Sequence, residues 1–106
     1  MLKKKICTLS KLKSGNYIKL WLKEFKDEII IFINNNKIYV KSSICPHFGG
    51  IIDYDENQKY LYCHWHGLKF SVDGKCLNQI NFKKCLDSYV HKIVKNNIYI
   101  YKNENS

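Results

Sequence analysis

Apolar and polar residues alternate along most of this chain, and short runs rich in Gly, Asn and Asp interrupt the alternation. A period of two is typical of strands that bury one face, whereas amphipathic helices repeat their apolar residues every three to four positions. Strands are therefore expected at residues 4–9, 17–23 and 37–42. A nearly continuous apolar run at 27–34 predicts a buried strand.

Turn signals separate these segments and divide the second half of the chain into further short strands. We find no convincing helix, although a short helical turn could lie in the ambiguous segment 77–85. The pattern predicts an all-β fold of eight to ten strands in a sandwich or partly open barrel. The turns are expected at residues 12–16, 34–37, 56–59, 73–74 and 96–97.

The length of 106 residues suits a single domain, 1–106, and 45% hydrophobic residues suit a globular one. No run of about 18 apolar residues predicts a membrane span, and no apolar segment near the start predicts a secretory signal. Five cysteines in such a chain favour a reducing compartment, so we expect a cytoplasmic protein without disulfides.

The formal net charge is +9, and all 18 basic residues are lysines. The lysines are scattered along the sequence apart from Lys3, Lys4 and Lys5. Nucleic-acid recognition favours Arg, which is absent, so we do not expect a nucleic acid as partner. Because no apolar run predicts a membrane span, we do not expect a membrane as partner either. A solvated lysine surface is the interpretation we favour. The alternative is a basic face that steers an acidic protein partner.

Two short motifs carry the chemistry. Cys45 and His47 form C-x-H, and Cys63 and His66 form C-x-x-H fifteen residues later. Fifteen residues suit a hairpin that brings both motifs side by side. Two thiolates and two imidazoles can hold tetrahedral Zn or a [2Fe–2S] cluster with Cys on one iron and His on the other. One Cys and one His in each motif favour the cluster, because each loop then reaches both metals.

With these motifs the chain resembles the Rieske iron–sulfur proteins, in particular the small Rieske-type ferredoxins. The resemblance implies an antiparallel Rieske sandwich or partly open barrel with a two-loop cluster-binding subdomain at about 44–84. It implies one [2Fe–2S] cluster per chain. It also implies that Cys45 and Cys63 hold the inner iron, and that His47 and His66 hold the outer iron nearer the surface.

The comparison with this family also predicts the type of centre. High-potential relatives add a disulfide, but Gly50 and Trp65 stand at those positions. Leu68 and Phe70 replace hydroxyl residues that donate hydrogen bonds near the cluster. The potential is therefore expected toward the low end of the Rieske range of about −150 to +300 mV. His64 stands where many relatives have proline, and we interpret it as a bystander.

The resemblance implies an electron-transfer protein rather than an enzyme. We expect a soluble one-electron carrier that links a flavin reductase to an oxygenase or a similar acceptor. One alternative is a small electron-transfer subunit of a larger reductase, like those of nitrite reductases. Another is a non-enzymatic redox or iron sensor.

Relatives shield the cluster with a proline-containing loop, whereas this chain has no proline at 78–84.

Overall fold

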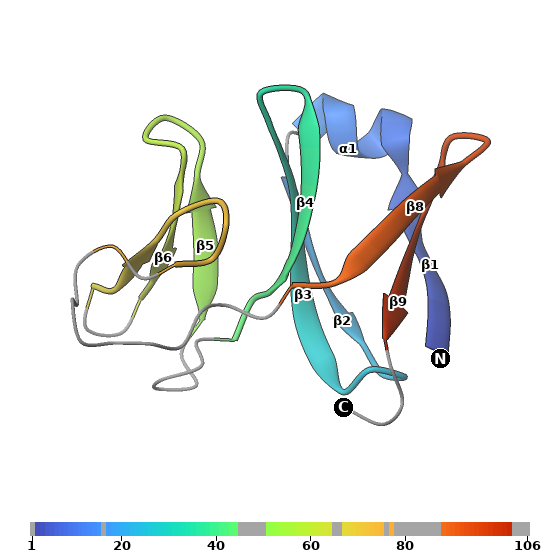
Figure 1. Ribbon diagram of the computed structural model, residues 1–106, viewed down its shortest axis with the longest axis horizontal. Coiled ribbons are helices and arrows are strands. Elements are labelled where there is room, and N and C mark those ends of the chain that lie inside the picture. Colours follow the sequence, from blue (N-terminus) through green and yellow to red (C-terminus); the bar gives the residue numbers. More distant parts are fainter. Residues whose placement is uncertain are drawn as a thin grey trace.

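The computed structural model describes residues 2–15, 17–44, 51–64, 67–75, 77 and 88–102. Within this part of the chain, strands form three antiparallel three-stranded sheets with the orders β1-β9-β8, β2-β3-β4 and β5-β6-β7, none of them closed into a barrel (Figure 1). The all-β prediction is therefore confirmed. The elements are β1 Leu2–Thr8, α1 Leu9–Gly15, β2 Tyr17–Leu22, β3 Asp27–Asn34, β4 Lys37–Ser42, β5 Ile52–Asp55, β6 Tyr60–Cys63, β7 Lys69–Phe70, β8 Val90–Val94 and β9 Asn97–Lys102.

Strand β3 contributes to two separate cores. Ile30 and Phe32 point to one side of the central sheet, and Ile29 and Ile31 point to the other; all four are 0% exposed. Because successive side chains in a strand face opposite ways, burial on both faces requires a continuous apolar run. This is why residues 27–34 lack the alternation seen elsewhere.

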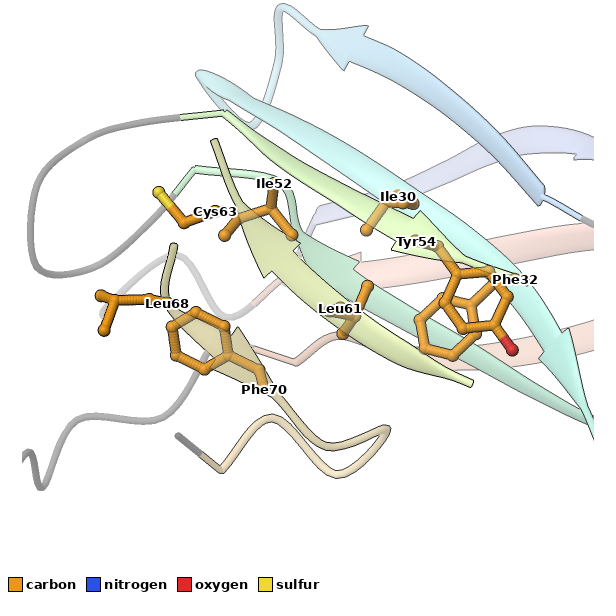
Figure 2. Packing of buried hydrophobic residues seen from close by; sticks show 8 residues of the cluster. All are labelled: Ile30, Phe32, Ile52, Tyr54, Leu61, Cys63, Leu68 and Phe70. Atoms are coloured by element: carbon orange, nitrogen blue, oxygen red, sulfur yellow. The ribbon is translucent and has the colours of Figure 1, made fainter. Parts of the chain in front are cut away.

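We name the two cores by their position. The loop-side core joins β3 to β5, β6 and β7, and the terminal-side core joins β3 to α1 and β9. The loop-side core contains Ile30, Phe32, Ile52, Tyr54, Leu61, Cys63, Leu68 and Phe70 (Figure 2). The terminal-side core contains Leu12, Leu22, Phe25, Ile29, Ile31, Val40, Ile98 and Ile100.

A short helix, α1, occupies residues where a turn was predicted at 12–16, so that prediction was wrong. The side-chain oxygen of Thr8 accepts a hydrogen bond from the Lys11 amide at 3.2 Å, as a helix N-cap does. Leu12 is fully buried in the terminal-side core. The cap and one buried leucine stabilise a helix too short to show a convincing period in the sequence.

The remaining turns agree closely with the sequence. The last hairpin turns at Lys95–Asn96, one residue earlier than predicted, and both residues have the positive φ that such turns require. Gly74 has φ +90° in the turn predicted at 73–74, but no strand follows it among the described residues 74, 75 and 77. Residues 78–85 of the ambiguous segment lie outside the described residues, and the subdomain bounds 44–84 stay a prediction.

Replacement of Phe32 by Ala tests the division of the interior into a loop-side core and a terminal-side core. Phe32 stacks on Tyr54 and Tyr39, with ring centroids 4.4 and 5.2 Å apart. We expect Phe32→Ala to lower the free energy of unfolding by about 3–5 kcal/mol in urea titration, with faster amide exchange in β5 and β6 than in β9. The matched variant Ile31→Ala should cost about 2–5 kcal/mol and show the reverse exchange pattern. Identical exchange patterns in both variants would contradict two separate cores.

Candidate metal centre

The segment 45–50, which contains the first predicted motif, is held at both ends by one antiparallel contact. Ile44 and Ile51 form an isolated β-bridge. The Ile52 amide donates a hydrogen bond of 2.8 Å to the Ser43 carbonyl oxygen. Ile44 and Ile51, which flank the segment, are therefore neighbours, just after the end of β4 and just before the start of β5.

The second motif begins at the end of β6, directly beside the first. Ile52 pairs with Cys63, and the His64 amide donates to the Ile51 carbonyl at 3.0 Å. The Cys63 amide donates to the Leu68 carbonyl at 2.7 Å, which closes the segment 64–67. The β5–β6 hairpin with its turn at 56–59 thus brings the ends of both motif segments together, as the fifteen-residue spacing predicted.

Cys63 is the predicted ligand that the structure describes. It is the last residue of β6, 1% exposed, and belongs to the loop-side core. Figure 2 shows Cys63 and Leu68 at one end of this core, with Phe32 and Tyr54 at the other. A cysteine at the edge of an apolar core, beside the point where both motif segments begin, fits a thiolate ligand of a buried metal group.

The other predicted ligands, Cys45, His47 and His66, lie outside the described residues, as do Gly50 and Trp65. Within the ranges that the structure covers, no group of three or more His, Cys, Asp or Glu side chains is close enough to hold a metal ion. The four-residue ligand set therefore stays a prediction. Its chemistry, two thiols and two imidazoles on adjacent segments, fits a [2Fe–2S] group with mixed ligands.

Leu68 and Phe70 belong to the same apolar core as Cys63. Leu68 is 1% exposed and Phe70 is 0% exposed, and both pack in the loop-side core with Cys63. Neither side chain carries a hydroxyl that could donate a hydrogen bond. The structure thus places both residues in the core that Cys63 joins, where the low-potential interpretation needs apolar groups.

His64 interacts with a carboxylate rather than with the other motif residues that the structure describes. Its Nε2 forms a short hydrogen bond with Asp53 Oδ2, and Lys19 Nζ lies 3.0 Å from Asp53 Oδ1. Burial raises the pKa of Asp53, but the hydrogen bonds from His64 and Lys19 outweigh it, so the pKa lies below its usual value. The Tyr62 ring meets the His64 ring edge-on at 5.1 Å.

Sequence reasoning missed Asp53 as the partner of His64. Asp53 lies opposite Tyr62 in the β5–β6 ladder, so His64 is its diagonal neighbour. The predicted turn at 56–59 determines which residues of the hairpin lie opposite each other, so the sequence could have revealed the pair. The contact supports the interpretation of His64 as a bystander, because its Nε2 is already engaged on the outer surface of the hairpin.

For the three cysteines outside the two motifs, Cys7, Cys76 and Cys85, the sequence predicts small buried hydrophobes rather than ligands. Cys7 is partly buried against the terminal-side core, and burial raises the pKa of its thiol. Both observations fit that prediction. Cys76 and Cys85 lie outside the described residues.

Comparison with known proteins identifies the family. The model of the Rieske [2Fe-2S] domain matches residues 3–96. The cytochrome b6-f complex iron-sulfur subunit of Chlorobaculum tepidum is 32% identical over 56 residues, which are 52% of this chain. Those residues span only 31% of that relative's length.

Solved structures share the fold at low sequence identity. The cyanobacterial plasma membrane Rieske protein PetC3 from Synechocystis PCC 6803 has a TM-score of 0.79 and 21% identity, with 93% of this chain and 99% of that chain covered. The ferredoxin of carbazole 1,9a-dioxygenase from Nocardioides aromaticivorans IC177 has a TM-score of 0.74 and 17% identity, with 97% of this chain and 100% of that chain covered. A putative NADH-dependent nitrite reductase small subunit from Mycobacterium tuberculosis has a TM-score of 0.66 and 16% identity, with 93% of both chains covered.

The family match agrees with the two-motif geometry and with the buried cysteine at its junction. No helix in the described part of the chain is long and apolar enough to cross a membrane. Rieske domains bind a [2Fe–2S] cluster and transfer electrons. With residues 3–96 of 106 matched, the chain belongs to the Rieske [2Fe-2S] domain family.

Proposed function

We propose that this protein is a one-electron carrier in which Cys45, His47, Cys63 and His66 hold one [2Fe–2S] cluster per chain. One observation carries the proposal: the ladder at Ile52–Cys63 places the ends of both motif segments side by side, with a buried cysteine at the junction. In this assignment Cys45 and Cys63 hold the inner iron. His47 and His66 would hold the outer iron.

The residues around Cys63 suit an electron carrier. The bound cluster supplies one-electron oxidation and reduction. Two thiolates balance the charge of the oxidised group, and neutral imidazoles add none. Leu68 and Phe70 exclude water from the side of Cys63 that faces the core and offer no hydroxyl to stabilise added negative charge. A low reduction potential is the consequence.

A flavin-dependent reductase and an oxygenase or similar acceptor are the partners we propose, in a reducing, cytoplasmic compartment. The likeness to the ferredoxin of carbazole 1,9a-dioxygenase supports this choice, because the whole of that chain is covered. The likeness to a nitrite reductase small subunit, which is less close, favours a second candidate, a tightly bound subunit of a larger reductase.

Turnover kinetics separate these candidates. We expect the holoprotein, mixed with NADH, a flavin-dependent ferredoxin reductase and cytochrome c, to support many rounds of cytochrome c reduction. The rate should rise linearly with carrier concentration, because a carrier dissociates between electron transfers. A complex that persists in both redox states would favour the subunit. Redox-dependent binding without turnover would favour the sensor.

The two histidines of the second motif give a matched pair of variants for the ligand assignment. His66→Ala should lose the visible absorption of the cluster and lower the iron content, because one ligand of the outer iron is removed. His64→Ala should retain both, since the proposal gives His64 no ligand role. Retained absorption in His66→Ala together with loss in His64→Ala would overturn the assignment.

Leu68 tests the origin of the low potential. We expect Leu68→Ser to raise the reduction potential by on the order of 50 mV, because a hydroxyl beside Cys63 can stabilise the reduced, more negative group. Leu68→Ala is the control, since it removes the same bulk without adding a donor. Protein-film voltammetry measures both. Equal potentials in the two variants would refute the hydrogen-bond explanation.

A further inference from the structure

The positive charge of the chain comes almost wholly from its two ends. Residues 2–15 and 88–102 contain eight of the 18 lysines and no Asp or Glu. These two segments therefore account for +8 of the net charge of +9, and the rest of the chain is nearly neutral. The lysines look scattered in the sequence because the two segments are more than 70 residues apart.

The fold joins these segments in one sheet, β1-β9-β8. Lys3 and Val90 both lie opposite Tyr101, and Lys5 and Lys92 both lie opposite Tyr99. Residues directly opposite in a ladder share a face, and every second residue along a strand returns to it. One face therefore carries, among others, seven residues that we call the lysine–tyrosine face: Lys3, Lys5, Val90, Lys92, Val94, Tyr99 and Tyr101.

This face is directed to solvent. The opposite face of β9 buries Ile98 and Ile100 in the terminal-side core, both 0% exposed. On the lysine–tyrosine face, Val90 is 69% exposed and Val94 is 46% exposed.

The lysines of the face lie among its tyrosines. Lys3, Lys5 and Lys92 are all exposed. Lys3 Nζ lies 4.6 Å from the centroid of the Tyr99 ring, and Lys92 Nζ lies 6.0 Å from that of Tyr101. Lys4, on the other face of β1, pairs with Glu24 at 3.0 Å. Because the three strands contain no acidic residue, the face itself is a positive surface.

The lysine–tyrosine face and the candidate metal centre belong to opposite ends of the molecule. Figure 1, drawn with the longest axis horizontal, shows the β5-β6-β7 sheet at one end and the β1-β9-β8 sheet at the other, with β2-β3-β4 between them. The longest extent is 41 Å. A surface bound to the lysine–tyrosine face would therefore leave the metal-centre end accessible to redox partners.

We propose that the lysine–tyrosine face binds anionic lipid headgroups at a membrane surface. Protein interfaces are depleted in Lys and enriched in Arg, whereas each Lys near an anionic bilayer adds attraction without needing a fixed partner. Tyrosine is favoured at the membrane–water interface, and lysine side chains can lie along apolar groups with the ammonium in the headgroup layer. Exposed valines add apolar contact. This binding is peripheral and needs no membrane-spanning segment, so it revises the expectation from the sequence that a membrane is not a partner. It does not depend on the proposed function.

Vesicle sedimentation with the holoprotein tests the proposal. We expect the protein to sediment with vesicles of one part phosphatidylserine to two parts phosphatidylcholine, and not with phosphatidylcholine alone. Binding should weaken steeply as salt rises, because exposed charges are screened. Absence of binding to the anionic vesicles at low salt, or equal binding to both vesicle types, would overturn the proposal.

A matched pair of triple variants locates the binding surface. Both lower the net charge from +9 to +3. The first changes the face, with Lys3→Glu, Lys5→Glu and Lys92→Glu. The control changes exposed lysines elsewhere, with Lys23→Glu, Lys37→Glu and Lys59→Glu. We expect partition onto anionic vesicles to fall by on the order of 100-fold or more in the first, and by under about tenfold in the control.

Unfolding curves and the cluster spectrum check that both variants are folded; if the first is not, Lys→Gln changes at the same positions replace it. Equal losses of vesicle binding in both variants would show that net charge alone drives binding and would overturn the assignment of binding to the lysine–tyrosine face. Unchanged vesicle binding in the first variant, with slower reduction by the reductase, would instead assign the face to an acidic protein and overturn the lipid proposal.

Discussion

The antiparallel register that sets Ile52 opposite Cys63 determines most of what this molecule can do. Backbone hydrogen bonds from the Ile52, Cys63 and His64 amides hold the ends of segments 45–50 and 64–67 together. A shift of one residue would turn Cys63 out of the loop-side core and the exposed His64 into it. The ladder thus selects which side chain of the second motif faces inward, before any metal is considered.

Strand β3 extends this order through the molecule. It presents Ile30 and Phe32 to the β5-β6-β7 sheet, which carries the candidate metal centre, and Ile29 and Ile31 to the sheet formed by the chain ends. Both outer sheets therefore pack against the same strand, β3, although they are chemically different. One carries a thiol among apolar groups, and the other carries the lysine–tyrosine face. This separation suits a protein that holds a redox group at one end and a surface contact at the other.

Strand alternation and turn residues predicted most of the fold, because residues 17–23 and 37–42 follow the period of two, residues 27–34 form one apolar run, and the hairpins are short. Helix α1 was missed, since a single cap at Thr8 and one buried residue, Leu12, leave little periodic signal. The pair of Asp53 with His64 required the β5–β6 register, and the lysine–tyrosine face required the pairing of both chain ends. The spacing of the two motifs correctly predicted that the ends of their segments lie together. Three of the four predicted ligands lie outside the described residues, so the ligand set rests on sequence.

The central claim is that both motifs together hold one mixed-ligand [2Fe–2S] cluster. Electron paramagnetic resonance of anaerobically purified, dithionite-reduced protein, with metal and sulfide analysis of the same sample, tests it most directly. The account predicts two irons and two sulfides per chain and a rhombic signal with a low average g value, as His ligation of one iron requires. A silent spectrum from a zinc-containing sample, purified from iron-replete cells, would contradict it.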